Sequence, residues 1–134
     1  AGMNMKLHYR FYNRGDVSDA VSHAACQASE DLSASAIIAI TKSGYTAEKI
    51  SKYRPETLII AATPNEKTYW QQSLVRGVRP ILTERSEDWE QLKKEAILKT
   101  CRAGSIRKGE KVVISAGLPP QMSGRTNMML IEQV

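Results

Sequence analysis

Apolar residues along the chain fall into two patterns, short continuous runs and stripes at helical spacing. A continuous run rich in β-branched residues is typical of a strand buried on both faces of a parallel sheet. Such runs predict strands over residues 36–40, 58–62, 78–82 and 111–116. Apolar positions three and four residues apart predict helices over residues 16–32, 47–53, 63–75 and 86–102. Strand and helix therefore alternate along most of the chain.

The first predicted helix carries one apolar stripe, which we expect to be its buried face. The stripe consists of Val17, Ala20, Val21, Ala24, Ala28 and Leu32. Its alanines allow close approach to a neighbouring element, and Asp16 or Ser18 is the expected N-cap. The corresponding positions of the last predicted helix are Trp89, Leu92, Ala96, Leu98 and Cys101.

The order of the elements predicts an α/β fold. Strands separated by helices favour right-handed crossovers and a doubly wound, mostly parallel sheet. A fifth strand is predicted over residues 128–132, after a Gly- and Pro-rich loop at residues 117–126. A loop of about ten residues is too short for a βαβ crossover, so this strand should run antiparallel beside the fourth. We expect a three-layer α/β/α sandwich whose five strands have the order 3-2-1-4-5.

Length and composition indicate one domain. The chain has 134 residues; residues 1–5 resemble a cloning remnant, which leaves residues 6–134 as the domain. No apolar run approaches the roughly 20 residues that cross a bilayer, and no leader opens the chain, so we expect no membrane association. Cys26 and Cys101 are too few for a disulfide scaffold and lack metal-ligand spacing, which favours a reducing cytoplasm.

The formal net charge of +5 favours an anionic partner. The basic residues are scattered and interleaved with acidic ones, without the basic run or aromatic platform of a nucleic-acid-binding protein. A small phosphorylated ligand suits this distribution better than nucleic acid.

In an open α/β sheet, ligands bind beyond the carboxyl ends of the strands, where neighbouring strands send their connections to opposite faces. With the predicted order, this point lies between the first and fourth strands. It is bordered by residues 41–46 and 117–126, two loops rich in residues that bind anions. The pattern therefore predicts a ligand site between these loops.

The first loop has the residues of a phosphate cradle. Thr41, Ser43 and Thr46 provide hydroxyls, Lys42 provides a cation, and Gly44 permits close approach of the backbone. The loop also opens a helix, whose first N–H groups favour an anion. A simple helix cap is the alternative, since Ser and Thr often cap helices. Neither a Walker loop nor a dinucleotide-binding glycine turn is present, so nucleotide hydrolysis has no support.

The second loop combines turn-forming residues with an arginine. The residues that we place in the site are Gly117, Pro120, Ser123, Gly124 and Arg125. Arg125 suits a second anionic group, so this loop would close as a flap over a bisphosphate. The alternative is an ordinary edge connection with a solvated arginine.

These segments resemble a known family. The sequence Thr41-Lys42-Ser43-Gly44-Tyr45-Thr46-Ala47, followed by residues 50–55, closely resembles the signature of the carboxy-terminal domain of pyruvate kinases. Further blocks resemble that family in order and spacing, at residues 59–65, 77–80, 109–119 and 124–129. The resemblance extends from about Val17 to the end of the chain.

The resemblance implies a regulatory domain that has no catalytic residues of its own. In this family, the loop matching residues 41–46 holds a phosphate of an activator, and the loop matching residues 117–125 closes over it. Trp89 matches an aromatic residue that some members add, whereas no arginine matches its partner. Fructose 1,6-bisphosphate, ribose 5-phosphate and AMP are candidate effectors.

The parent reaction of the family converts phosphoenolpyruvate and ADP to pyruvate and ATP with Mg and K, on a catalytic barrel that this chain does not resemble. The resemblance also implies pairing of these domains in a homo-tetramer. The apolar residues 128–131 of the exposed last strand suit pairing with a partner, and the alternative is an interior edge position within the monomer. Two alternatives to an excised regulatory domain stay open. One is a stand-alone relative that binds or acts on a phosphorylated metabolite, and the other is a purely structural tetramerisation module.

Overall fold

A computed structural model describes residues 15–120 and 124–134 of the chain. Its strands are β1 (Ala36–Ile40), β2 (Leu58–Thr63), β3 (Val78–Leu82), β4 (Lys111–Ala116) and β5 (Met128–Gln133). Its helices are α2 (Val17–Asp31), α3 (Tyr45–Ser51), α4 (Glu66–Gln72) and α5 (Trp89–Arg102). In the described ranges, none of these helices is both long and apolar enough to cross a bilayer. Residues 1–5, interpreted above as a cloning remnant, lie outside the described residues.

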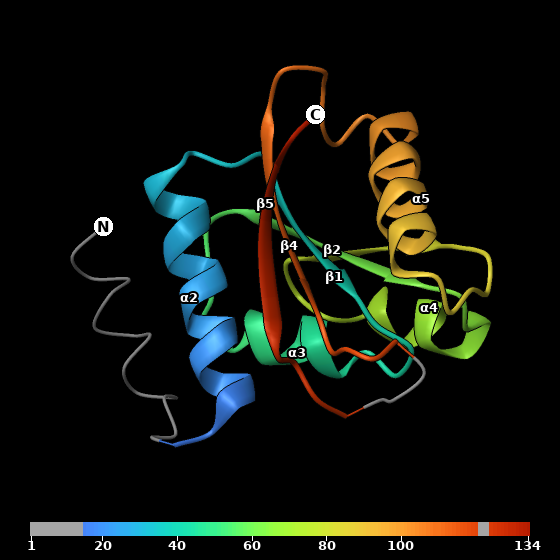
Figure 1. The fold of residues 1–134 in the computed structure, drawn as a ribbon, viewed down its shortest axis with the longest axis horizontal. Coiled ribbons are helices and arrows are strands. Elements are labelled where there is room, and N and C mark those ends of the chain that lie inside the picture. Colours follow the sequence, from blue (N-terminus) through green and yellow to red (C-terminus); the bar gives the residue numbers. More distant parts are fainter. Residues whose placement is uncertain (1–14, 121–123) are drawn as a thin grey trace.

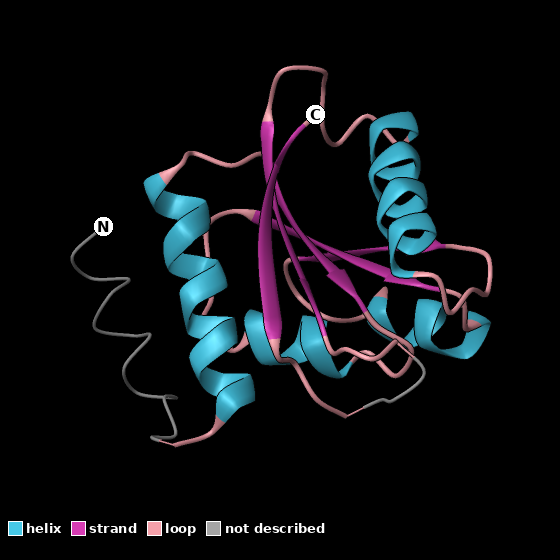
Figure 2. Cartoon of the chain, viewed as in Figure 1, coloured by secondary structure: helices cyan, strands magenta, loops and turns pink. Residues whose placement is uncertain are grey.

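The five strands form one sheet in the order β3-β2-β1-β4-β5. β1 pairs in parallel with β2 and β4, β2 pairs in parallel with β3, and β5 pairs antiparallel with β4. The strands cross the middle of the molecule with helices on either side (Figures 1 and 2). The predicted α/β fold, the strand order and the antiparallel last strand are confirmed.

Each face of the sheet has its own apolar core. Because successive side chains of a strand point to opposite faces, Ile37 of β1 belongs to one core and Ile38 to the other. The first core contains Ala25 and Cys26 from α2 and Ala47 and Ile50 from α3. The second contains Ala96 from α5. The two cores explain the continuous apolar runs of the central strands, which are covered on both sides.

All four helices begin at residues other than those predicted: α2 starts one residue late, and α4 starts at Glu66 rather than at residue 63, with Asn65 as its N-cap. α5 starts at Trp89 rather than at residue 86, because Asp88 has extended backbone and its Oδ1 accepts the N–H of Glu90 at 3.1 Å. α3 starts at Tyr45 rather than at residue 47, with Gly44 as its N-cap. Residues 86–88 therefore belong to the loop after β3.

The predicted buried face of the first helix is wrong for most of its residues, although Ala28 does pack against the first core. The buried residues of α2 are Ser18, Asp19, Ser22, Ala25, Cys26 and Ser29, whereas the side chain of Val17 is 60% exposed. Small polar residues can face the core where their hydroxyls are bonded locally, as Ser29 Oγ donates to the carbonyl of Cys26 at 2.8 Å. Leu98 of α5, also predicted to be buried, is 48% exposed.

Candidate functional site

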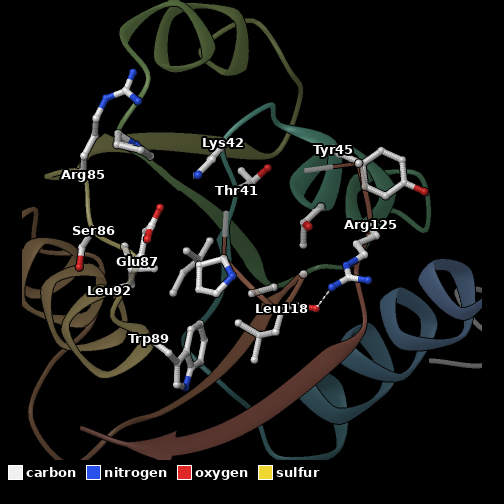
Figure 3. Close-up of a pocket in the computed structure, with 17 residues that line it drawn as sticks. Thr41, Lys42, Tyr45, Arg85, Ser86, Glu87, Trp89, Leu92, Leu118 and Arg125 are labelled. Carbon is white, nitrogen blue, oxygen red and sulfur yellow. Dashed lines mark hydrogen bonds between the residues drawn. The ribbon is translucent and has the colours of Figure 1, made fainter. Parts of the chain in front are cut away.

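A cavity of about 290 Å³ lies at the carboxyl ends of β1 and β4. Ile40 and Ala116, the last residues of these two strands, form part of its lining. The remaining walls come from the loops that follow the strands, and Figure 3 shows their side chains around the opening. The cavity thus occupies the position in the sheet at which the sequence predicts a ligand site.

Eight of the eleven predicted site residues line this cavity. They are Thr41, Lys42, Tyr45, Thr46, Gly117, Pro120, Gly124 and Arg125. Ser43 and Gly44 belong to the same loop as the first four but are not part of the lining. Ser123 lies outside the described residues.

The hydroxyls of the first loop hold the loop together. Thr41 Oγ1 accepts the N–H of Gly44 at 2.9 Å, and Ser43 Oγ accepts the N–H of Tyr45 at 3.3 Å. These are the local bonds of a capped helix start, so the capping alternative describes part of their role. A hydroxyl that accepts still has a proton to donate, so Thr41 can also bond a ligand oxygen.

Lys42 brings a positive charge to the cavity. Its carbonyl oxygen accepts the hydroxyls of Thr63 at 3.4 Å and Thr68 at 2.7 Å, which anchors the backbone of the loop to the end of β2 and to α4. Within residues 15–120 and 124–134, Lys42 Nζ forms no hydrogen bond or ion pair. In the described residues, this half-buried cation at the lining has no ion-pair partner, which favours an anionic ligand.

Gly44 makes room for a buried side chain. Its backbone has φ +89°, and a Cβ at this position would lie 2.2 Å from Nε2 and 2.9 Å from Cδ of Gln72. Gln72 is 2% exposed and ends α4. Glycine is therefore needed here for the turn and for close packing of α4 against the loop.

The two ends of the second loop are tied to each other. Asn127 Nδ2 donates to the carbonyl of Leu118 at 2.7 Å, and Asn127 Oδ1 accepts the N–H of Leu118 at 2.8 Å. The guanidinium of Arg125 donates to the same carbonyl, as the dashed line in Figure 3 marks. A Cβ on Gly117 would lie 2.2 Å from the backbone oxygen of Arg125. Arg125 therefore braces the loop, in addition to lining the cavity.

Thr126 connects this loop to two helices. Its N–H donates to Ser18 Oγ of α2 at 3.0 Å, and its Oγ1 shares a hydrogen bond of 2.8 Å with Thr46 Oγ1 of α3. All three side chains are buried. A second link joins the same helices, because Lys49 Nζ donates to Asp19 Oδ1 at 2.7 Å. This hydrogen bond raises the pKa of Lys49 against the opposing effect of burial.

The loop after β3 supplies a wall of the cavity, of which the family resemblance predicts only Trp89. Arg85, Ser86, Glu87 and Trp89 all line the cavity. Trp89 is the residue that the family resemblance singled out, whereas Arg85 and Glu87 carry no local motif. The sequence pattern predicts a helix over residues 86–88. Asp88 is a common N-cap residue, and a helix start placed after it would have left these residues in the loop.

No metal site is evident in the described residues: nowhere in these ranges do three or more His, Cys, Asp or Glu side chains come close enough to hold an ion.

Comparison with known proteins identifies the family. The profile of the family described as "Pyruvate kinase, alpha/beta domain" matches residues 19–132. The chain belongs to this family. A pyruvate kinase of Clostridium acetobutylicum is 40% identical over 119 residues, which cover 89% of this chain and 25% of that protein. A pyruvate kinase of Thermotoga maritima is 41% identical over 123 residues, covering 92% of this chain and 26% of that protein.

The pyruvate kinase alpha/beta domain therefore accounts for nearly the whole chain, whereas the chain spans about a quarter of the length of these two curated relatives. The resemblance recognised in residues 41–46 and the following blocks is confirmed.

Proposed function

We propose that this chain is the regulatory domain of a pyruvate kinase and binds a phosphorylated effector in the cavity between residues 41–46 and the loop residues 117–120 and 124–125. The parent reaction, phosphoryl transfer from phosphoenolpyruvate to ADP, is assigned to the part of the enzyme beyond this domain. The observation that carries the proposal is Lys42, a half-buried cation without a partner in the described residues, at the lining of a cavity that also contains Thr41.

Phosphate is the anion that best suits these groups. Lys42 Nζ provides donors with a full charge, and the hydroxyl of Thr41 provides a neutral donor beside it. The apolar part of the lining, including Leu92 and Leu118, suits the carbon skeleton of a sugar or nucleoside. α3 has only seven residues, so the proposal rests on these side chains rather than on the start of that helix.

Calorimetric titration with ribose 5-phosphate, AMP and fructose 6-phosphate tests this proposal. Lys42→Met should weaken binding about ten- to hundredfold, the range for a lost charged hydrogen bond. Lys52→Met is the matched control, because Lys52 is exposed at the end of α3 and does not line the cavity. If no phosphorylated compound binds at about millimolar concentration, or both variants bind like the wild type, the proposal is wrong.

We also propose that the outer edge of β5 takes part in contact between subunits. β5 is an edge strand, and its Met129 and Ile131 are 38% and 39% exposed. Such an edge offers free backbone groups and an apolar surface to a second copy. Analytical ultracentrifugation should find an oligomer that Ile131→Lys dissociates and Leu74→Lys, at an exposed apolar residue beyond α4, leaves intact. A wild-type chain that is monomeric throughout would rule out this contact in the isolated domain.

A further inference from the structure

The charges around the cavity are unevenly distributed. Lys42, from the loop after β1, and Arg125, from the loop after β4, each bring a cation to the lining, and Arg85 and Glu87 both come from the loop after β3. Figure 3 shows the Arg85 side chain extending away from the centre of the opening, on the same side as Glu87. In the described part of the chain, none of these four side chains forms an ion pair, and Arg125 donates to the carbonyl of Leu118. The walls from the loops after β1 and β4 are therefore cationic, while the wall from the loop after β3 carries one charge of each sign.

We propose that Glu87 makes this cavity select ligands with a single phosphate over ligands with two. This inference rests on the proposed function, since it takes phosphate binding at Thr41 and Lys42 as its starting point. Glu87 then determines specificity, and the ligand has one phosphate on an uncharged body that bears hydroxyl groups.

A first phosphate at Lys42 directs the rest of a ligand toward the other walls of the cavity. Trp89 and Leu92 offer this body an uncharged surface, against which a sugar ring can pack. The carboxylate of Glu87 accepts hydrogen bonds, so it suits ligand hydroxyls at the far end.

A second phosphate at the far end meets a less favourable environment. The charge of Glu87 offsets that of Arg85, so this wall gives a second anion no net attraction. Glu87 is exposed, so the energy with which its carboxylate repels a phosphate is that between two charges in water. A phosphate carries a charge of about −1.5 to −2, so a carboxylate about 4 Å away weakens binding roughly tenfold.

Fructose 6-phosphate and fructose 1,6-bisphosphate test this inference, because they differ by one phosphate. Calorimetry on the wild type should find tighter binding of the monophosphate. In Glu87→Gln, affinity for the bisphosphate should rise about tenfold, while affinity for the monophosphate changes little. Glu84→Gln is the matched control, because it removes the same charge from the same loop at a residue that does not line the cavity. Added salt should reduce the wild-type preference, since screening weakens repulsion between exposed charges.

The outcomes separate this inference from the proposed function. Suppose that Lys42→Met weakens binding of the monophosphate, but the wild type binds the bisphosphate at least as tightly as the monophosphate. The proposed function would then stand, and the role of Glu87 would be overturned. An unchanged ratio of the two affinities in Glu87→Gln would do the same. If the fructose body does not bind, ribose 5-phosphate and ribose 1,5-bisphosphate provide the same comparison. Failure of every phosphorylated compound would overturn both.

Discussion

Replacement of Gly44 by alanine should destabilise the domain through two separate effects. Alanine at φ +89° adopts a left-handed backbone conformation, which costs about 1–2 kcal/mol. Its Cβ would also lie 2.2 Å from Nε2 of Gln72, a side chain that is 2% exposed and has little room to move. Overpacking of this kind costs about 1–3 kcal/mol.

The two costs are partly offset in the unfolded chain, where alanine has less conformational freedom than glycine by about 0.4–1 kcal/mol. The expected loss in the free energy of unfolding is therefore roughly 2–4 kcal/mol. A small domain has about 5–15 kcal/mol of stability, so the variant should still fold. With a urea dependence of about 1–3 kcal/mol per molar, the midpoint of unfolding should fall by about 1–2 M.

Urea denaturation followed by circular dichroism measures this loss, and Gly77→Ala separates the two effects. Gly77 has φ +80°, but a Cβ there meets nothing within 4 Å, so its replacement carries the backbone cost alone. Gln72→Ala removes the colliding group, and Gly44→Ala in that background should cost little more than Gly77→Ala. If Gly44→Ala is no more destabilising than Gly77→Ala in the wild-type background, the packing argument is refuted.

Three further predictions concern the groups around the site. Burial raises the pKa of the Cys26 thiol to about 12, so iodoacetamide at pH 8 should label this cysteine only after unfolding, as peptide mass mapping would show. The Lys49–Asp19 hydrogen bond raises the pKa of Lys49, so the stability it contributes is complete below the ordinary lysine value of about 10.4 and is lost as the pH rises through the higher folded-state pKa. Lys49→Met should therefore cost about 1–2 kcal/mol at pH 8, and progressively less as the pH rises above the ordinary lysine pKa, in urea titrations; a difference that is constant with pH would contradict this reasoning. Thr126→Val should cost about 1 kcal/mol by removing the hydrogen bond to Thr46, and Thr126→Ser should restore it; equal stability of the two variants in thermal denaturation would contradict that role.

The sheet could be predicted because its strands carry a local signal. The strands over residues 78–82 and 111–116 have the predicted bounds, since apolar, β-branched runs between turn residues identify strands without tertiary information. The antiparallel last strand followed from the length of the preceding loop. The buried face of α2 could not be predicted in this way, because Ser18 and Ser29 are buried by contacts with distant elements.

The site was only partly predictable for the same reason. The loops after β1 and β4 have recognisable composition, and the strand order brings them together. Arg85 and Glu87 reach the cavity because of where the loop after β3 lies, and neither has a neighbour in sequence that indicates this. The role of Gly44 was also hidden, because its contact, Gln72, lies in another helix.

The hydrogen bonds of Thr126 bear on how the domain folds. They join residues 80 and 108 positions apart in the chain, to Thr46 and to Ser18 respectively. Contacts between such distant positions slow folding, because the entropy of closing a long loop is lost before the contact forms. The cavity is lined by loops after β1, β3 and β4, so its lining is complete only when these distant parts of the chain have come together. A ligand that binds only the complete cavity stabilises the folded domain by mass action.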